Sequence, residues 1–190
     1  MTRLLAAAAV LAAVVAGAAR ADTIEVVGEE QVAAPLALPS AAGPNAPGTL
    51  LLPPNVFEAP FGPVRELPYT ELQALWHRAG AAYGVPWQVL AAINKIESNF
   101  GRNMGPSSAG AVGWMQFMPE TWLRWGTDGS GDGIADPWDP EDGILSAARY
   151  LAAAGAATDL PRAIFAYNHA QWYVDDVLEL AALFGDGETP

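Results

Sequence analysis

The chain has 190 residues, with 9 basic against 21 acidic side chains, a formal net charge of −12 and no cysteine. This charge argues against nucleic acid as a partner, because too few cations are present to replace the counterions of a phosphate backbone. The absence of cysteine excludes disulfide bonds, thiolate metal sites and a cysteine nucleophile, and the length predicts a single domain.

Residues 1–21 have the pattern of a secretory signal peptide. Arg3 precedes an apolar run over residues 4–18, and small residues flank Arg20 before Asp22. The run is shorter than the roughly 20 apolar residues that a membrane-spanning helix needs. We therefore expect cleavage before Asp22, export to the periplasm or the cell exterior, and no stable membrane insertion afterwards.

Residues 22–66 are rich in alanine, proline and glycine and show no sustained helical or strand period. Such a segment buries too little apolar surface to offset the entropy lost on ordering, so we interpret it as a flexible spacer. The folded domain is expected over residues 67–186, followed by a tail at 187–190. Three apolar side chains of the spacer are candidates for docking onto the domain: Val56, Phe57 and Phe61.

Helically spaced apolar residues, prolines in first turns and glycines after last turns predict a series of short helices. Thr70 and Gln73 match a capping box, and Asp139 is the predicted cap of a later helix. No segment alternates as a strand does, so the expected fold class is all-α, with one long acidic loop. In chain order the helices are expected from Thr70 to Tyr83, Pro86 to about Asn99, Pro119 to Trp125, Asp139 to before Gly155, Pro161 onward, and about Gln171 to Phe184.

Glu97 interrupts the apolar stripe of the second predicted helix, four residues after Ile93 and seven after Leu90. Burial and the negative end of the helix dipole both disfavour a carboxylate there. The pattern therefore predicts a raised pKa for the Glu97 carboxyl, as a general acid working near neutral pH requires. The alternative is a solvated glutamate at the edge of the stripe, or one paired with Lys95 or Arg102.

Three motifs follow one another in the chain: Glu97–Gly101, Gly113–Pro119 and Ala166–Asn168. Together, over roughly residues 68–184, they resemble the motifs of the lytic transglycosylases of the SLT group, which share the goose-type lysozyme fold. A further stretch, Asp136-Pro137-Trp138, is more similar to the membrane-bound B-type branch. The resemblance implies cleavage of the β-1,4 bond between N-acetylmuramic acid and N-acetylglucosamine in peptidoglycan. We expect a monomer that needs no cofactor for its chemistry.

The resemblance also assigns roles to individual residues. Glu97 matches the single acid/base, which protonates the glycosidic oxygen and then accepts the proton of the muramoyl 6-hydroxyl. That oxygen attacks the anomeric carbon, so the product is a 1,6-anhydromuramoyl end and no water is consumed. The substrate-binding residues that the resemblance implies are Ser98, Met115, Gln116, Phe117, Tyr167 and Asn168, with the Tyr167 hydroxyl near the acid.

Several of these aromatic and apolar residues have a simpler interpretation as core. Core packing is the alternative for Met115, Phe117 and Tyr167, and a role at the helix terminus is the alternative for Ser98. Four tryptophans could stack on sugar rings, although core packing is favoured for most of them: Trp114, Trp122, Trp125 and Trp172.

Residues 128–139 form the acidic loop. Oxygen-bearing side chains occupy loop positions 1, 3, 5, 9 and 12, with Gly133 at position 6, which is the spacing of an EF-hand calcium loop. Serine at position 3 and aspartate at position 12 depart from that pattern. The alternative is a solvated loop in which Asp139 only caps a helix. The predicted ligands of a structural Ca²⁺ are Asp128, Ser130, Asp132, the Ile134 carbonyl, Asp136 and Asp139.

Two other functions remain open at this stage. A lysozyme-type hydrolase would need a second carboxylate to activate water, which Asp128, Asp132 or Asp136 could supply. A non-catalytic wall-binding module would retain Glu97 only as a vestige.

Overall fold

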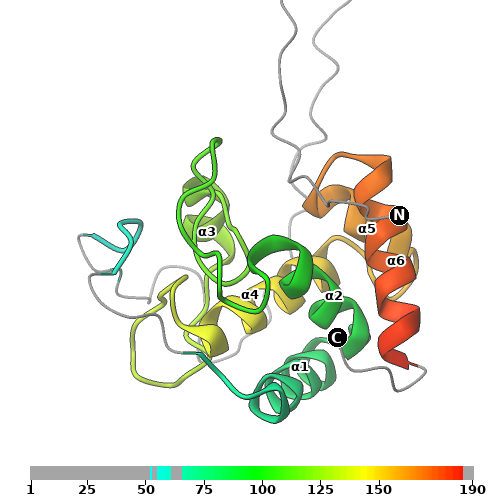
Figure 1. Ribbon diagram of the computed structural model, residues 1–190, viewed down its shortest axis with the longest axis horizontal. Coiled ribbons are helices and arrows are strands. Elements are labelled where there is room, and N and C mark those ends of the chain that lie inside the picture. The colour runs from blue at the N-terminus through cyan, green and yellow to red at the C-terminus, as the bar shows by residue number, and fades with distance from the viewer. Residues whose placement is uncertain (1–51, 53–54, 61–65, 186–190) are drawn as a thin grey trace, which may run out of the picture. The chain divides into compact units, whose positions relative to one another are not determined.

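A computed structural model describes residues 52, 55–60 and 66–185. This part of the chain forms six α-helices and no strand, apart from an isolated bridge between Val112 and Phe117. The predicted all-α fold class and the order of the helices are confirmed. The helices, labelled in Figure 1, are α1 (Tyr69–Tyr83), α2 (Trp87–Ser98), α3 (Pro119–Trp125), α4 (Pro140–Ala153), α5 (Leu160–Tyr167) and α6 (Gln171–Gly185).

Some expectations concern residues outside the described part. The signal at residues 1–21, most of the spacer at 22–66 and the tail at 187–190 lie there, and the domain bounds 67 and 186 stay predictions. None of the described helices is long and apolar enough to cross a membrane.

Helix starts follow the local chemistry that the sequence predicts, with one exception. The Asp139 side chain accepts the amide protons of Glu141 and Asp142, and Pro140 occupies the first turn of α4. The predicted capping box at Thr70 is wrong: α1 starts at Tyr69 and has no side-chain cap. Pro68, with φ −57°, precedes the helix and starts it one residue early, so Thr70 already lies inside the first turn.

The core surrounds α2, which packs against α1, α4 and α6; Figure 1 shows it between α1 and α6. The six consecutive residues Val89–Asn94 are all buried, because neighbouring helices cover every side of α2. The sequence pattern, by contrast, predicts a one-sided stripe. The central position of α2 fixes the backbone that carries Glu97.

One part of the predicted spacer contacts the helical domain. The side chain of Val56 is buried, and Phe57 packs against the core. The indole nitrogen of Trp138 donates a hydrogen bond to the Val56 carbonyl at 2.8 Å. The predicted docking is therefore confirmed for Val56 and Phe57, while Phe61 lies outside the described residues.

Candidate active site

Glu97 lies in the last turn of α2, and its side chain is partly exposed. Asn99 and Phe100, just beyond the helix, have φ of 51° and 59°. This left-handed conformation is uncommon for residues other than glycine, and such strain clusters at functional sites. The chain therefore turns away from the helix directly after Ser98, one residue beyond Glu97.

Burial raises the pKa of the Glu97 carboxyl to about 7 and outweighs the opposing effect of a hydrogen bond from Tyr173. The direction agrees with the sequence prediction. Among the described residues, neither Lys95 nor Arg102 pairs with Glu97, and no second carboxylate contributes to the shift. A carboxyl group with this pKa is present in both protonation states near neutral pH, which suits a group that acts as acid and then as base.

Tyr173 is a site residue that the sequence analysis did not identify. Its hydroxyl donates a hydrogen bond to Oε1 of Glu97 at 2.6 Å, and its ring is buried on α6. The apolar spacing of Tyr173, Val174 and Val177 places the tyrosine on the inner face of α6. That spacing cannot identify which group the hydroxyl meets, because the partner lies 76 residues away in the chain.

Replacing Tyr173 with phenylalanine is expected to move the titration midpoint of Glu97 upward from about 7. The hydrogen bond lowers the pKa of Glu97 because it stabilises the ionised form, so its loss leaves burial unopposed. The measurement is a pH titration of the labelled Glu97 carboxyl carbon by NMR.

The matched control is Tyr167→Phe, because the Tyr167 hydroxyl donates to the Met115 carbonyl at 2.7 Å and not to Glu97. This variant is expected to leave the midpoint near that of the unmutated protein. A Tyr173→Phe midpoint that stayed in place or moved downward would contradict the assigned role.

Ser98 connects the end of α2 to the Gly113–Pro119 motif. Its Oγ donates to the Trp114 carbonyl at 2.7 Å and accepts the Gly101 amide proton at 2.9 Å. The Asn94 side-chain amide donates to the same carbonyl at 2.9 Å. Because Ser98 is 0% exposed, its hydroxyl positions the motif beside Glu97 and has no surface on which a substrate could bind.

Gln116 lies at the tip of a tight turn closed by the Val112–Phe117 bridge. Its φ is 47°, and its side-chain nitrogen donates to the carbonyls of Gly113 at 3.0 Å and Met104 at 3.3 Å. The side chain is partly exposed. The amide nitrogen thus holds the turn, and the amide oxygen is the end of the side chain that a sugar hydroxyl could contact.

The α5–α6 corner meets the same turn through Tyr167. In addition to its hydrogen bond to the Met115 carbonyl, the Tyr167 ring contacts the Phe117 ring edge-on. Burial, and after it the negative charge of Glu97, raises the pKa of Tyr167 well above its usual value. Asn168, directly after α5, is partly exposed.

Two of the predicted substrate contacts lie beneath the surface. Met115 is 0% exposed and Phe117 is 3% exposed. Their side chains therefore pack beneath the turn, as the core interpretation proposed. Only their backbone atoms could contact a substrate.

Among the four tryptophans considered for sugar stacking, the structure separates one from the rest. Trp114, Trp122 and Trp125 are buried, whereas Trp172 is 54% exposed. The Trp172 ring lies 5.8 Å from the Tyr173 ring in an edge-on arrangement, so Tyr173 links it to Glu97.

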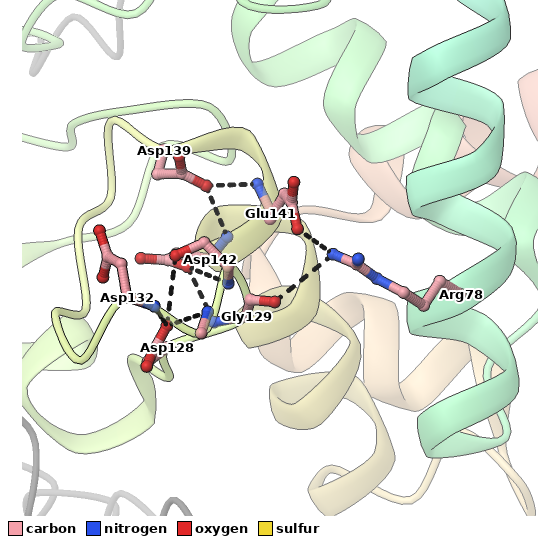
Figure 2. A network of polar contacts seen from close by, with 9 residues as sticks. Arg78, Asp128, Gly129, Asp132, Asp139, Glu141 and Asp142 are labelled. Atoms are coloured by element: carbon pink, nitrogen blue, oxygen red, sulfur yellow. Dashed lines mark hydrogen bonds and ion pairs between the residues drawn. The ribbon is translucent and has the colours of Figure 1, made fainter.

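The acidic loop is organised by hydrogen bonds from its own backbone (Figure 2). Both Asp128 oxygens accept amide protons, including those of Gly131 and Gly133. Buried Asp142, which the predicted ligand set omits, accepts amide protons from Gly129, Ser130 and Asp136. Burial raises the pKa of Asp142 to about 6 despite these bonds. Asp142 is therefore the anchor of the loop on α4.

The predicted calcium ligands are not gathered in this structure. Among the described residues, no three acidic or histidine side chains are placed as a group that could hold a metal ion. Two features do agree with the predicted loop: Gly133 has φ 91°, as a sharp turn at position 6 requires, and the donors are the oxygens that Ca²⁺ prefers. The donors therefore suit Ca²⁺ in type, but their present arrangement does not form a site.

The sequence matches the family of transglycosylase SLT domains over residues 67–108 and 104–163, which together span half of the chain. The chain belongs to this family. The match contains Glu97 and the Gly113–Pro119 turn, two of the three motifs on which the resemblance rests.

A curated relative is membrane-bound lytic murein transglycosylase B of Escherichia coli (strain K12), with 29% identity over a match 123 residues long that covers 42% of this chain and 34% of the relative. The chain thus spans about a third of that relative's length. The Escherichia coli lytic transglycosylase SLT35, solved in complex with calcium, has a TM-score of 0.58 at 20% identity and covers 63% of this chain and 72% of its own. SltB3 from Pseudomonas aeruginosa, in complex with NAG-anhNAM-pentapeptide, has a TM-score of 0.53 at 19% identity. That match covers 61% of this chain and 63% of the SltB3 chain. These likenesses confirm the lysozyme-like fold.

Proposed function

We propose that the protein is an exported lytic transglycosylase that cleaves peptidoglycan strands between N-acetylmuramic acid and N-acetylglucosamine. The observation that carries the proposal is Glu97, a partly exposed carboxyl group with a pKa near 7 and no charged partner among the described residues. Membership in the SLT domain family and the peptidoglycan fragment bound to SltB3 support the substrate class.

The proposed reaction uses one carboxyl group twice. Protonated Glu97 gives its proton to the glycosidic oxygen, and the bond to the muramoyl anomeric carbon breaks. The resulting carboxylate accepts the proton of the muramoyl 6-hydroxyl, whose oxygen bonds to that carbon. The products are an N-acetylglucosamine end and a 1,6-anhydromuramoyl end, and Glu97 regains its proton. A pKa near 7 favours both transfers.

The residues around Glu97 are proposed to hold the strand and the acid in place. Tyr173 orients the carboxyl group through its hydrogen bond. The amide oxygen of the partly exposed Gln116 and the side chain of Asn168 contact sugar substituents, while Tyr167 positions the Gln116 turn. Three buried side chains fix the backbone of that turn and do not contact the substrate themselves: Ser98, Met115 and Phe117.

The experiment that tests this function is mass spectrometry of purified peptidoglycan digested with the protein from residue 22 onward. Products lighter by one water than hydrolysed muropeptides are the expected result, because the 6-hydroxyl takes the place of water. Hydrated, reducing-end products would overturn the proposal and assign the protein to the hydrolases. Binding without any cleavage would support the wall-binding alternative.

The structure gives a reason to prefer the lyase over the hydrolase. The aspartates of the acidic loop, Asp128, Asp132 and Asp136, direct carboxylate oxygens to backbone amides of their own loop. None of them contributes to the pKa shift of Glu97. A hydrolase would need one of them close enough to Glu97 to act on the same bond.

Trp172 is proposed as a platform on which a sugar ring stacks. Trp172→Ala is expected to weaken binding of glycan strands about fivefold, because stacking on an exposed indole is lost. Binding by isothermal titration, with Leu183→Ala as a matched control on the same helix, checks the effect. Leu183 is 40% exposed. Equal losses in the two variants would contradict the role of Trp172.

A structural Ca²⁺ held by the acidic loop stays a prediction, and the proposed chemistry does not involve it. The pKa values of Asp136 and Asp139 are raised by burial and by neighbouring negative charges, and a cation would relieve that repulsion. We expect the melting temperature to rise on addition of CaCl₂, with about 2.7 kcal/mol of stabilisation at 100 times Kd, and to fall back with EDTA.

The control variant for this prediction is Asp132→Asn, which removes one ligand charge but keeps an oxygen for the Ile134 amide proton. Its melting temperature should respond less to Ca²⁺. Identical melting curves in CaCl₂ and EDTA for the unmutated protein would eliminate the predicted ion.

A further inference from the structure

A pocket of about 210 Å³ lies where the start of α1 meets the end of α2, outside the site described above. Its walls carry two cations, Lys95 and Arg102, one carboxylate, Glu66, and the rings of Tyr69 and Phe100. Two of the chain's nine basic residues therefore converge on one small cavity of a protein whose net charge is −12.

Among the described residues, neither cation is paired with an acidic side chain. Within the described residues, Lys95 and Arg102 form no ion pair, whereas Arg78 is paired with Glu141. The Lys95 ammonium lies 4.9 Å from the centre of the Phe100 ring, which holds it beside the pocket while its hydrogen-bond donors stay available. The pocket thus presents hydrogen-bond donors from two cations. Because Glu66 contributes one negative charge, the net charge of the pocket is +1.

We propose that this pocket binds the terminal carboxylate of a peptidoglycan stem peptide. A single carboxylate matches the net charge of the pocket, and Arg102 suits its planar shape. The Phe100 ring and the neighbouring Leu67 provide apolar surface for the small side chain of a terminal residue. The inference rests on the proposed function, because it takes its ligand from the same substrate.

The distance from the acid is compatible with such a ligand. Lys95 and Glu97 share the last turn of α2, but two residues correspond to about 200° of rotation, so they lie on nearly opposite sides of the helix. The stem peptide hangs from the muramoyl residue whose bond is cleaved. A pentapeptide extends to about 17 Å, which is close to half the circumference of a helix roughly 10–12 Å in diameter, so a fully extended stem is long enough to reach around the end of α2.

The test measures binding without turnover, in a Glu97→Gln background. Isothermal titration compares three probes: NAG-NAM-pentapeptide, the same compound with a C-terminal amide, and the peptide-free disaccharide. The acid is expected to bind about five- to tenfold more tightly than the amide. In the double variant Lys95→Gln/Arg102→Gln, the acid and the amide should bind equally well, and the peptide-free disaccharide should bind as before.

The control is Arg124→Gln/Arg162→Gln, which removes the same charge at two residues outside the pocket and should keep the preference for the acid. Should the first double variant fail to fold, Arg102→Gln alone suffices, because Arg102 is exposed; it should reduce the preference about two- to threefold. The proposal is overturned if acid and amide bind alike before mutation, or if the variants keep the full preference.

Failure of this inference is distinguishable from failure of the proposed function. Cleavage of strands by the unmutated protein, without any preference for the carboxylate, removes the pocket assignment alone. A preference for the carboxylate without cleavage removes the lyase and retains a stem-binding pocket.

Discussion

Replacing Glu97 with glutamine is expected to lower the rate of strand cleavage by about three orders of magnitude. The amide keeps the size of the side chain and an oxygen for the Tyr173 hydroxyl, but it can neither give up nor accept the transferred proton. General acid–base catalysis contributes roughly 10²–10⁴ to a rate, and here one group supplies both steps. The measurement is the rate of anhydromuropeptide release from purified peptidoglycan at pH 7.

The same variant is expected to be more stable than the unmutated protein above neutral pH. Folding raises the pKa of Glu97 from 4.5 to about 7, so the folded state holds the proton more tightly than the unfolded state. The free energy of unfolding therefore falls as pH rises from about 4.5 to 7, by about 3 kcal/mol, and stays level above. The Glu97→Gln variant would carry no such penalty. In urea denaturation, its free energy of unfolding should therefore exceed that of the unmutated protein at pH 8 and equal it at pH 4.

The matched control is Glu120→Gln, which changes the nearest downstream carboxylate, an exposed side chain in the first turn of α3. It should leave both cleavage and the pH dependence of stability unchanged. Cleavage by Glu97→Gln at more than a tenth of the unmutated rate would refute the assignment of Glu97. A gain in stability together with lost cleavage would show that the loss is chemical and not a failure to fold.

The helices could be predicted because their signals are local. Pro119 and Trp125 bound α3 as predicted, and Asp139 caps α4 through its own side chain. The capping box at Thr70 failed because Pro68 starts α1 earlier, which is a competition between two local signals. In both cases the deciding residues lie within a few positions of the helix end.

The environment of Glu97 could be predicted in direction but not in detail. The position of Glu97 on an apolar face implies burial, and burial raises its pKa. The hydrogen-bond partner Tyr173 could not be identified, because it reaches Glu97 from α6 through a tertiary contact. Burial of Met115 and Phe117 was likewise undetermined, since apolar side chains in a motif suit a cleft and a core equally well.

The acidic loop illustrates a different limit. The sequence places oxygen donors at calcium spacing, but spacing does not state which atoms the backbone will use. Asp128 and Asp136 accept amide protons within the loop, and Asp142, outside the pattern, contributes the buried anchor. Local Asx-type bonds compete with metal coordination for the same oxygens, and only the fold shows this competition.

Replacing Gly113 with alanine is expected to destabilise the protein by about 4 kcal/mol. Gly113 has φ 80°, and a Cβ atom there would lie 2.0 Å from the carbonyl oxygen of Pro137. The left-handed conformation costs roughly 1–2 kcal/mol for a residue other than glycine, and overpacking against backbone adds about 1–3 kcal/mol. The Pro137 carbonyl cannot simply move away, because it accepts the Trp114 amide proton at 3.1 Å.

Gly110→Ala separates these two contributions. Gly110 has φ 90°, but an added Cβ would meet no atom within 4 Å, so only the conformational cost of about 1–2 kcal/mol applies. Urea denaturation gives the free energy of unfolding of each variant. The difference between the two values is the cost of separating the Gln116 turn from the acidic loop. If the two substitutions destabilise equally, the close approach at Pro137 does not constrain the turn. If Gly113→Ala is the more damaging and the folded fraction also loses cleavage, the contact between these loops holds Gln116 beside the acid.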